Sequence, residues 1–160
     1  MYKMYNKILL AIDDSEEAEK AIRRALEFKK NFDAEIVAFH SMKHHLIPQE
    51  LPLTVPMQNT YSFTIPQANY QKIHKAYEEK GEKILDKVKS RFEKEGLSLE
   101  TRLITKKDPE DYIKDIVEEE GFDLVILGHK GTHSKAREIL LGTVAREVLE
   151  KAECDVLISK

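Results

Sequence analysis

The order of apolar and polar positions along the chain predicts an alternation of buried strands and amphipathic helices. Residues 7–12 form a continuous apolar run, which is typical of a strand covered on both faces. Residues 35–40 and 123–127 repeat this pattern. Between the first two runs, residues 16–31 place alanine, isoleucine and leucine at helical spacing among charged residues, after Ser15 as a predicted N-cap. A helix that connects two such strands favours parallel pairing between them.

The rest of the chain continues this alternation with three more helices and two more strands. Leu97, Leu99 and Leu103 alternate with polar residues, which predicts a half-exposed strand at a sheet edge. Asp108 and Pro109 predict the start of a helix, as N-cap and first helical residue. The pattern predicts helices at 70–95, 109–120 and 143–152, and strands at 97–103 and 154–159.

Five strands that alternate with four helices predict a single α/β domain over residues 1–160. The expected architecture is an open five-stranded parallel sheet with helices on both faces. In such sheets, ligands bind at the carboxyl ends of the strands, where the strand order reverses. We therefore expect a site where the first strand and the strand at 123–127 end, provided that these two strands are neighbours.

Residues 41–69 interrupt the regular pattern. Prolines at 48, 52, 56 and 66 make a strand or helix hard to build there, so this segment is predicted to be a flap. Its many apolar residues indicate that it lies on its own subunit or on a partner. The interpretations that stay open are a structural insertion or an oligomer contact on one side, and a lid over the ligand site on the other.

Composition and charge narrow the class of protein. The net charge of −3 and a sequence pI of about 6.1 give no electrostatic case for nucleic-acid binding. No apolar run approaches the roughly 20 residues that a membrane-spanning helix needs. A single cysteine, Cys154, suits a reducing compartment, and we expect a cytoplasmic location and an inert, partly buried thiol.

The candidate chemistry lies in a group of glycines after the strand at 123–127. Gly128 and Gly131 are three residues apart, and Gly142 precedes Thr143 at a predicted helix start. Backbone N–H groups at a helix N-terminus attract anions, and glycines let a phosphate approach the main chain. The Walker A and Gly-x-Gly-x-x-Gly patterns are absent, which disfavours P-loop enzymes and dinucleotide dehydrogenases. By spacing alone, the glycines could equally serve only to turn the chain and to permit close packing.

Two longer motifs resemble the universal stress protein family, and the resemblance runs nearly end to end. Residues 8–15, Ile-Leu-Leu-Ala-Ile-Asp-Asp-Ser, resemble the opening of that family. The signature of its ATP-binding branch is Gly-x2-Gly-x9-Gly-Ser/Thr, and Gly128, Gly131, Gly142 and Thr143 match its fixed positions. Residues 139–141 and 154–158 are also typical. The spacer here holds ten residues where the family pattern has nine, and Ser41 stands where an apolar residue often lies along the adenine.

The resemblance implies a Rossmann-like fold of the adenine nucleotide alpha hydrolase type that binds ATP, with or without Mg²⁺, in stress response or signalling. Asp13 and the nearby backbone would hold adenine and ribose, while the glycines and Thr143 would take the phosphates. The resemblance also implies a homodimer through the closing strand at 156–158. The expected nucleotide-binding residues are Ile12, Asp13, Ser15, Ser41, Gly128, Lys130, Gly131, Gly142, Thr143 and Val144.

Each candidate residue also has a plainer role open to it. Asp13 could only cap the turn, Thr143 could only cap its helix, and Lys130 could be an ordinary surface lysine. His129 and His133 flank the glycine loop, as metal or phosphate contacts or as solvent-exposed side chains.

The leading hypothesis is a binding protein with no catalytic residues and no metal ligands of its own. Two alternatives remain. A weak ATP hydrolase would need a base or metal ligands beside the phosphates, for which the sequence offers Asp13, Asp14 and the loop histidines. An interaction module on the same fold would have lost ATP binding because of the longer spacer.

Overall fold

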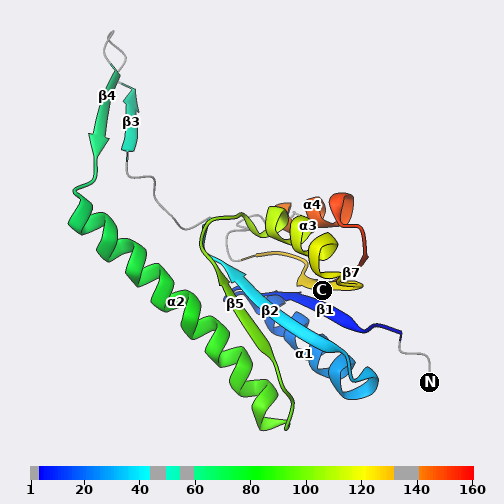
Figure 1. Cartoon of the computed structure of the whole chain (residues 1–160). Helices are drawn as coiled ribbons and strands as arrows, with labels where there is room; N and C mark the ends of the chain where they lie inside the picture. Colours follow the sequence, from blue (N-terminus) through cyan, green and yellow to red (C-terminus); the bar gives the residue numbers. More distant parts are fainter. Residues whose placement is uncertain (1–3, 44–49, 55–59, 132–140) are drawn as a thin grey trace.

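A computed structural model describes residues 4–43, 50–54, 60–131 and 141–160 of the chain (Figure 1). The helices and strands that the sequence pattern predicts are present in the predicted order, with most boundaries within three residues. Along the chain the elements are β1 (Lys7–Ala11), α1 (Glu16–Phe32), β2 (Glu35–Ser41), β3 (Glu50–Thr54), β4 (Thr60–Thr64), α2 (Gln67–Lys94), β5 (Glu100–Ile104), α3 (Pro109–Glu120), β6 (Leu124–Gly128), α4 (Thr143–Lys151) and β7 (Asp155–Ser159).

The main sheet has five strands in the order β5-β2-β1-β6-β7, and every neighbouring pair is parallel. This confirms the predicted α/β architecture, with the half-exposed strand β5 at an edge. The strands β1 and β6 are neighbours, and the order reverses between them. Their carboxyl ends therefore flank the position where open α/β sheets bind ligands.

Two hydrophobic cores lie on opposite faces of the sheet. Ile8 and Leu10 of β1 belong to the core beneath α1 and α2, while Leu9 belongs to the core beneath α3 and α4. All three are fully buried. Successive residues of a strand face opposite sides, so a strand with a core on each side must be apolar throughout. This is the physical reason for the continuous apolar runs in the sequence.

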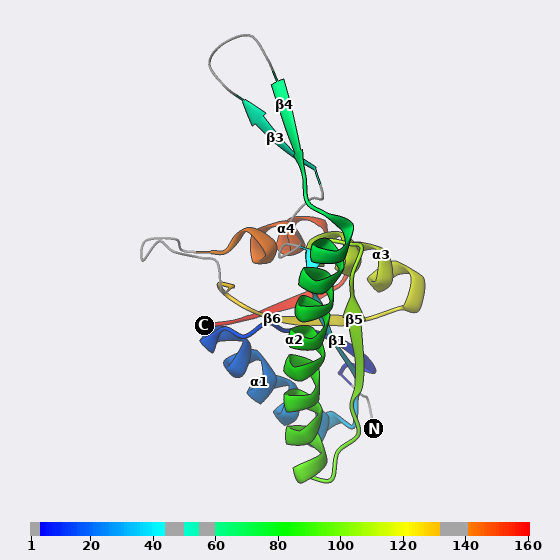
Figure 2. The same cartoon turned by 90° about the vertical axis from the view of Figure 1, so that its left-hand side faces the viewer.

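The prediction that no strand forms in residues 41–69 was wrong for two segments. The strands β3 and β4 pair antiparallel, with Pro52 opposite Ser62. Each strand of a two-stranded ribbon has one unpaired edge, and such an edge accepts a proline that lacks an N–H group. The ribbon lies at the N-terminal end of α2, which begins three residues earlier than predicted (Figures 1 and 2). The remainder of the predicted flap, at 44–49 and 55–59, lies outside the described residues.

The helix ends follow the sequence signals with one correction. The hydroxyl of Ser15 accepts a hydrogen bond from the backbone N–H of Ala18 at 3.1 Å, so the predicted N-cap is confirmed. Gly96 follows the end of α2 with a φ of 69°, a conformation that glycine adopts without strain. Asp108 occupies the N-cap position of α3, but its carboxylate makes no capping hydrogen bond. Its Oδ2 instead accepts from Nζ of Lys43 at 2.8 Å, because that charge lies within reach.

Side chains fasten the amino edge of the sheet. The Asp123 carboxylate accepts hydrogen bonds from the backbone N–H groups of Asn6 at 2.7 Å and Lys7 at 3.1 Å. The guanidinium of Arg102 contacts both oxygens of Glu120 at 2.6 and 3.0 Å, which joins β5 to the end of α3. These contacts lower the pKa of Glu120 to about 2, with the Arg102 hydrogen bond as the largest cause and Lys7 as a further one.

We expect Glu120→Gln to lower the free energy of unfolding at pH 7 by about 1 kcal/mol, because the pair is only partly shielded from solvent. A carboxylate with a depressed pKa stabilises the fold above its unfolded pKa and loses this effect as the pH falls. The difference in the free energy of unfolding between the variant and the wild type should therefore become smaller as the pH falls from about 4.5 to 2. Urea unfolding across this range measures it, with Glu118→Gln on the same helix as the control. If the difference in the free energy of unfolding stayed the same at the lowest pH, the Glu120 carboxylate would not be the stabilising group.

Candidate functional site

The β1–α1 turn and the loop after β6 meet at the carboxyl edge of the sheet. A methyl group placed on Gly131 would lie 3.0 Å from Oδ2 of Asp13, so the acidic turn and the glycine loop share one crevice. This adjacency follows from the direct pairing of β1 with β6. The sequence predicted it on the condition that these strands were neighbours, and they are.

The acidic turn is held in shape by its own hydrogen bonds. Oδ1 of Asp13 accepts from the backbone N–H of Ser15 at 2.9 Å, and the Ser15 hydroxyl caps α1. Ile12 is buried, and its N–H donates to the carbonyl of Phe39 on β2 at 3.0 Å. These bonds fix the Asp13 carboxylate with Oδ2 on the side of Gly131.

Gly128 allows the end of β6 to approach the first turn of α1. A methyl group on Gly128 would lie 2.8 Å from Cβ and 2.9 Å from the carbonyl carbon of Glu17. These distances are shorter than non-bonded carbon atoms allow, and one of the two atoms belongs to the backbone. Only glycine fits here without a shift of the helix.

Gly142 holds the start of α4 against the loop after β6. Its N–H donates to the carbonyl of His129 at 2.8 Å, and a methyl group on it would lie 3.3 Å from Cα of Lys130. Gly142 is itself the N-cap of α4, and no side chain among the described residues caps this helix. Thr143 is the exposed first helical residue, so it does not cap the helix. The first-turn N–H groups of α4 are thus available as donors to an anion.

The structure brings most of the predicted site residues to this edge. Lys130 is half-buried within the loop, and Val144 is half-buried in the first turn of α4. Ser41 ends β2 at the same edge, but its hydroxyl donates to the carbonyl of Lys107 at 2.6 Å and fastens the connection between β5 and α3. Residues 132–140 of the long spacer, with His133, lie outside the described residues.

Several contacts around the crevice have no sequence signal. Nδ1 of buried His40 donates to the carbonyl of Ile12 at 2.8 Å, which supports the turn from β2. Nζ of Lys80 on α2 lies 3.0 Å from Oδ2 of Asp14. The buried hydroxyl of Ser159, opposite Gly128 in the register, has no hydrogen-bond partner in the described part of the chain. Contacts between elements far apart in sequence leave no local pattern, so sequence reasoning missed them.

The single cysteine lies away from this crevice, at the start of β7. Burial, followed by the charge of Asp155, raises the pKa of the Cys154 thiol to about 11. The thiol is therefore protonated at neutral pH, which agrees with the interpretation of Cys154 as an inert side chain.

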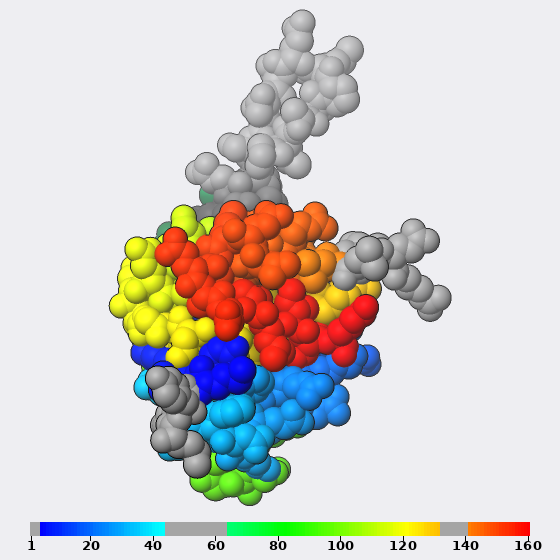
Figure 3. All heavy atoms as spheres, turned by 90° about the vertical axis from the view of Figure 1, so that its right-hand side faces the viewer, coloured from blue at the N-terminus to red at the C-terminus, as the bar shows by residue number. Residues whose placement is uncertain are grey.

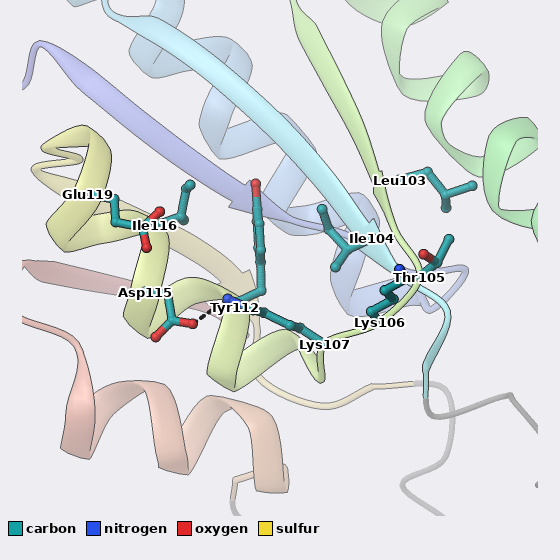
Figure 4. A pocket seen from close by; sticks show the side chains of 9 residues that line it. All are labelled: Leu103, Ile104, Thr105, Lys106, Lys107, Tyr112, Asp115, Ile116 and Glu119. Carbon is teal, nitrogen blue, oxygen red and sulfur yellow. Dashed lines mark hydrogen bonds and ion pairs between the residues drawn. The ribbon is translucent and has the colours of Figure 1, made fainter.

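A separate cleft of about 310 Å³ lies between β5 and α3 (Figure 4). Two of its lining residues form an ion pair, with Nζ of Lys107 2.5 Å from Oδ2 of Asp115. The cleft is at the β5 edge of the sheet, two strands away from the crevice between β1 and β6. Its lining residues are Leu103, Ile104, Thr105, Lys106, Lys107, Tyr112, Asp115, Ile116 and Glu119.

Comparison with known proteins gives a consistent result over the whole chain. The model of the universal stress protein family matches residues 4–160. Universal stress protein MJ0577 of Methanocaldococcus jannaschii is 30% identical over 167 residues, which span 100% of this chain and 98% of the relative. Universal stress protein YxiE of Bacillus subtilis is 28% identical over 155 residues, which span 97% and 99%.

Solved structures of similar proteins support the same fold. MJ0577 superimposes with a TM-score of 0.79 at 26% identity, covering 98% of this chain and 96% of the other. The universal stress protein from Archaeoglobus fulgidus in complex with dAMP gives 0.64 at 24% identity, covering 98% and 99%. A family protein from Arabidopsis thaliana with AMP bound gives 0.60 at 18% identity, covering 97% and 91%.

Gly128→Ala and Gly131→Ala should differ in their effect on the free energy of unfolding. We expect Gly128→Ala to lower the free energy of unfolding by about 1–3 kcal/mol, because the new methyl group meets the backbone of α1. Gly131→Ala should leave stability nearly unchanged, since Gly131 is exposed and its methyl group meets only a carboxylate oxygen. Urea unfolding at pH 7 measures both variants. Equal stability of Gly128→Ala and the wild type would contradict the close approach.

Proposed function

This chain belongs to the universal stress protein family, and from that membership we propose that it binds an adenine nucleotide, with ATP as the first candidate. The proposed site is the crevice between the β1–α1 turn and the glycine loop. The observation that carries the proposal is the position of the Asp13 carboxylate beside Gly131, with the uncapped start of α4 joined to the same loop. A carboxylate can accept hydrogen bonds from the ribose of a nucleotide, and main-chain donors can bind its phosphates.

The chemistry assigns a role to each side of the crevice. A fixed carboxylate accepts hydrogen bonds from ribose hydroxyls, which suits Asp13. The N–H groups around Gly131 and at the start of α4, with the exposed hydroxyl of Thr143, suit phosphate oxygens. Lys130 adds a positive charge in the same loop. A triphosphate carries more charge than a monophosphate and would use more of these donors, with or without Mg²⁺.

The relatives support the adenine class of ligand. Universal stress proteins have been solved with dAMP, with AMP and with cAMP. These ligands share the adenine base and differ in the sugar and in the phosphate. We propose that this chain acts in stress response or signalling through the same class of ligand, and that it does so in the cytoplasm, where its single thiol stays reduced.

We further propose a homodimer through β7. This strand is the outer strand of the sheet and pairs only with β6 within the described chain. The end of the chain lies open on the face shown in Figure 3. Its half-buried residues Val156, Leu157 and Ile158 form an apolar edge, and pairing with a second copy would cover it.

The nucleotide proposal predicts thermal stabilisation by ATP. At about 100 to 1,000 times the dissociation constant, ligand should raise the free energy of unfolding by about 3–4 kcal/mol. Asp13→Ala should remove most of this gain. Asp14→Ala is the matched control, because that exposed neighbour pairs with Lys80 and should leave the gain intact. Differential scanning fluorimetry with ATP, AMP and GTP measures the effect. The proposal fails if millimolar ATP gives no shift.

The dimer proposal predicts the effect of a proline in β7. The backbone N–H of Asp155 donates to Asp123, so Asp155 faces β6 and the next residue, Val156, directs its N–H outward. Val156→Pro should therefore leave the β6 pairing in place and convert a dimer into a monomer. Sedimentation velocity measures the mass, and circular dichroism checks the fold. A monomeric wild type would contradict the proposal.

A further inference from the structure

The outward main-chain groups of β7 belong to its even-numbered residues. The N–H of Asp155 and the carbonyl of Ser159, at the two ends of the strand, are both hydrogen-bonded to main-chain groups on the β6 side. Main-chain groups alternate in direction along a strand, so those of Val156 and Ile158 point away from the sheet. A further strand that pairs with β7 must therefore bond to these even-numbered residues.

The sequence of β7 is complementary to itself when two copies run antiparallel. Leu157 is the middle residue of the strand, with an apolar neighbour on each side and a polar residue at each end. About a two-fold axis at Leu157, Val156 lies opposite Ile158 of the second copy, and Asp155 lies opposite Ser159. Opposite residues of an antiparallel pair share one face of the sheet. Apolar side chains thus meet apolar ones, and no like charges oppose each other.

The neighbouring registers that keep the outward main-chain groups together are less complementary. With the axis at Ile158, Leu157 lies opposite Ser159. With the axis at Val156, Leu157 lies opposite the carboxylate of Asp155. A polar group that is buried against an apolar side chain loses hydrogen bonds to water and gains none. These registers also pair fewer residues of the strand, so the pattern of β7 favours the axis at Leu157.

The helix α4 extends the apolar edge on one face of the sheet. It contacts β7 and α3, and α3 also contacts β1 further inside the sheet. Figure 3 shows α4 and β7 next to each other on one open face of the molecule. Leu149 of α4 is 56% exposed, and only Met4 among the other large apolar residues of the described chain is also exposed. An exposed leucine thus lies close to the apolar edge strand.

Leu149 is on the side of α4 that faces away from α3. Lys151 lies on the α3 side of the helix, as its raised pKa indicates. The hydrogen bond to Glu147 is the largest cause of this raised pKa, and the charges of Asp111 and Glu110 on α3 contribute to it. Successive helical residues are about 100° apart, so Leu149 is about 200° from Lys151. Leu149 therefore faces outward over the edge of β7.

We propose that a second copy of this chain docks on β7 and α4 about a two-fold axis at Leu157. The inference rests on the dimer proposed above and specifies its geometry. Val156 and Ile158 of the two copies exchange main-chain hydrogen bonds, and the two sheets join into one. Paired strands are about 4.8 Å apart, so helices over the two β7 strands approach to about 10 Å, which is a contact distance. Leu149 packs in this helix contact.

Disulfide cross-linking tests the position of the axis. Cys154, the single cysteine of the chain, is first replaced by serine. Leu157→Cys then places two thiols opposite each other, with Cα atoms about 4.5 Å apart, which a disulfide spans. Val156→Cys and Ile158→Cys are the matched controls, because the Cα atoms of each pair are about 9 Å apart. With oxidised glutathione, we expect Leu157→Cys to form the covalent dimer about tenfold faster than either control.

A mixture of two variants gives a second measurement of the register. Asp155→Cys and Ser159→Cys oppose each other only when the axis is at Leu157. An equimolar mixture in the Cys154→Ser background should therefore form the mixed disulfide about tenfold faster than either variant links to itself. Circular dichroism checks that each variant folds. This measurement decides the register even if Leu157→Cys fails to fold.

The helix contact is tested by the dissociation constant of the dimer. Leu149→Gln should raise this constant about tenfold, because both copies lose an apolar contact. Glu150→Gln is the matched control, since it introduces the same side chain at an exposed neighbour about 100° further round the helix. It should change the constant less than about twofold. Sedimentation velocity over a range of protein concentrations measures both variants.

The outcomes separate this geometry from the dimer itself. The register is wrong if the protein sediments as a dimer and a control cysteine links as fast as Leu157→Cys, or if the mixed disulfide is not preferred. The helix contact is wrong if Leu149→Gln and Glu150→Gln have equal effects. A monomeric wild type would overturn the dimer and this geometry together.

Discussion

The backbones of β6 and α1 approach each other at Gly128, and the geometry of the crevice depends on this contact. Because Gly128 has no side chain, the first turn of α1 settles against the end of β6. As a result, the β1–α1 turn lies over the carboxyl edge of the sheet, and the Asp13 carboxylate lies beside Gly131. The packing of α1 on β6 and the position of the Asp13 carboxylate thus both depend on Gly128. A larger side chain there would displace the helix and, with it, the carboxylate.

The two ends of the sheet are stabilised in different ways. Side-chain charges fasten the amino edge, where Arg102, Glu120 and Asp123 connect strands and helix ends. Main-chain hydrogen bonds and glycine contacts organise the carboxyl edge, as at Gly142 and His129. The charged side-chain contacts lie at the amino edge, and the carboxyl edge keeps polar main-chain groups that a ligand can use. The strand order reverses at that edge, which opens the space between the loops.

The run of apolar residues predicted the buried strand β1, and Ser15 as a capping residue predicted the start of α1. The neighbouring positions of β1 and β6 followed from general rules of α/β topology. The hairpin was missed because Pro52 is tolerated only in a ribbon with free edges, and the sequence alone does not show this context. Gly81 lets α2 pack against β5, because a methyl group at this position would lie 2.6 Å from Cδ1 of Leu103. The cleft beside β5 is lined by residues of β5, the following loop and α3, and no local pattern in the sequence indicates it.

The positions of residues near the two chain ends determine where a tag or fluorophore is best attached. Asn6 and Lys7 are clamped at the amino edge by Asp123, on the side of the sheet away from the crevice. Ser159, in contrast, is opposite Gly128, and its carbonyl accepts from the N–H of His129 within the glycine loop. An affinity tag or fluorophore fused after Lys160 would therefore emerge at the mouth of the crevice. Fusion at the other terminus keeps the label clear of it.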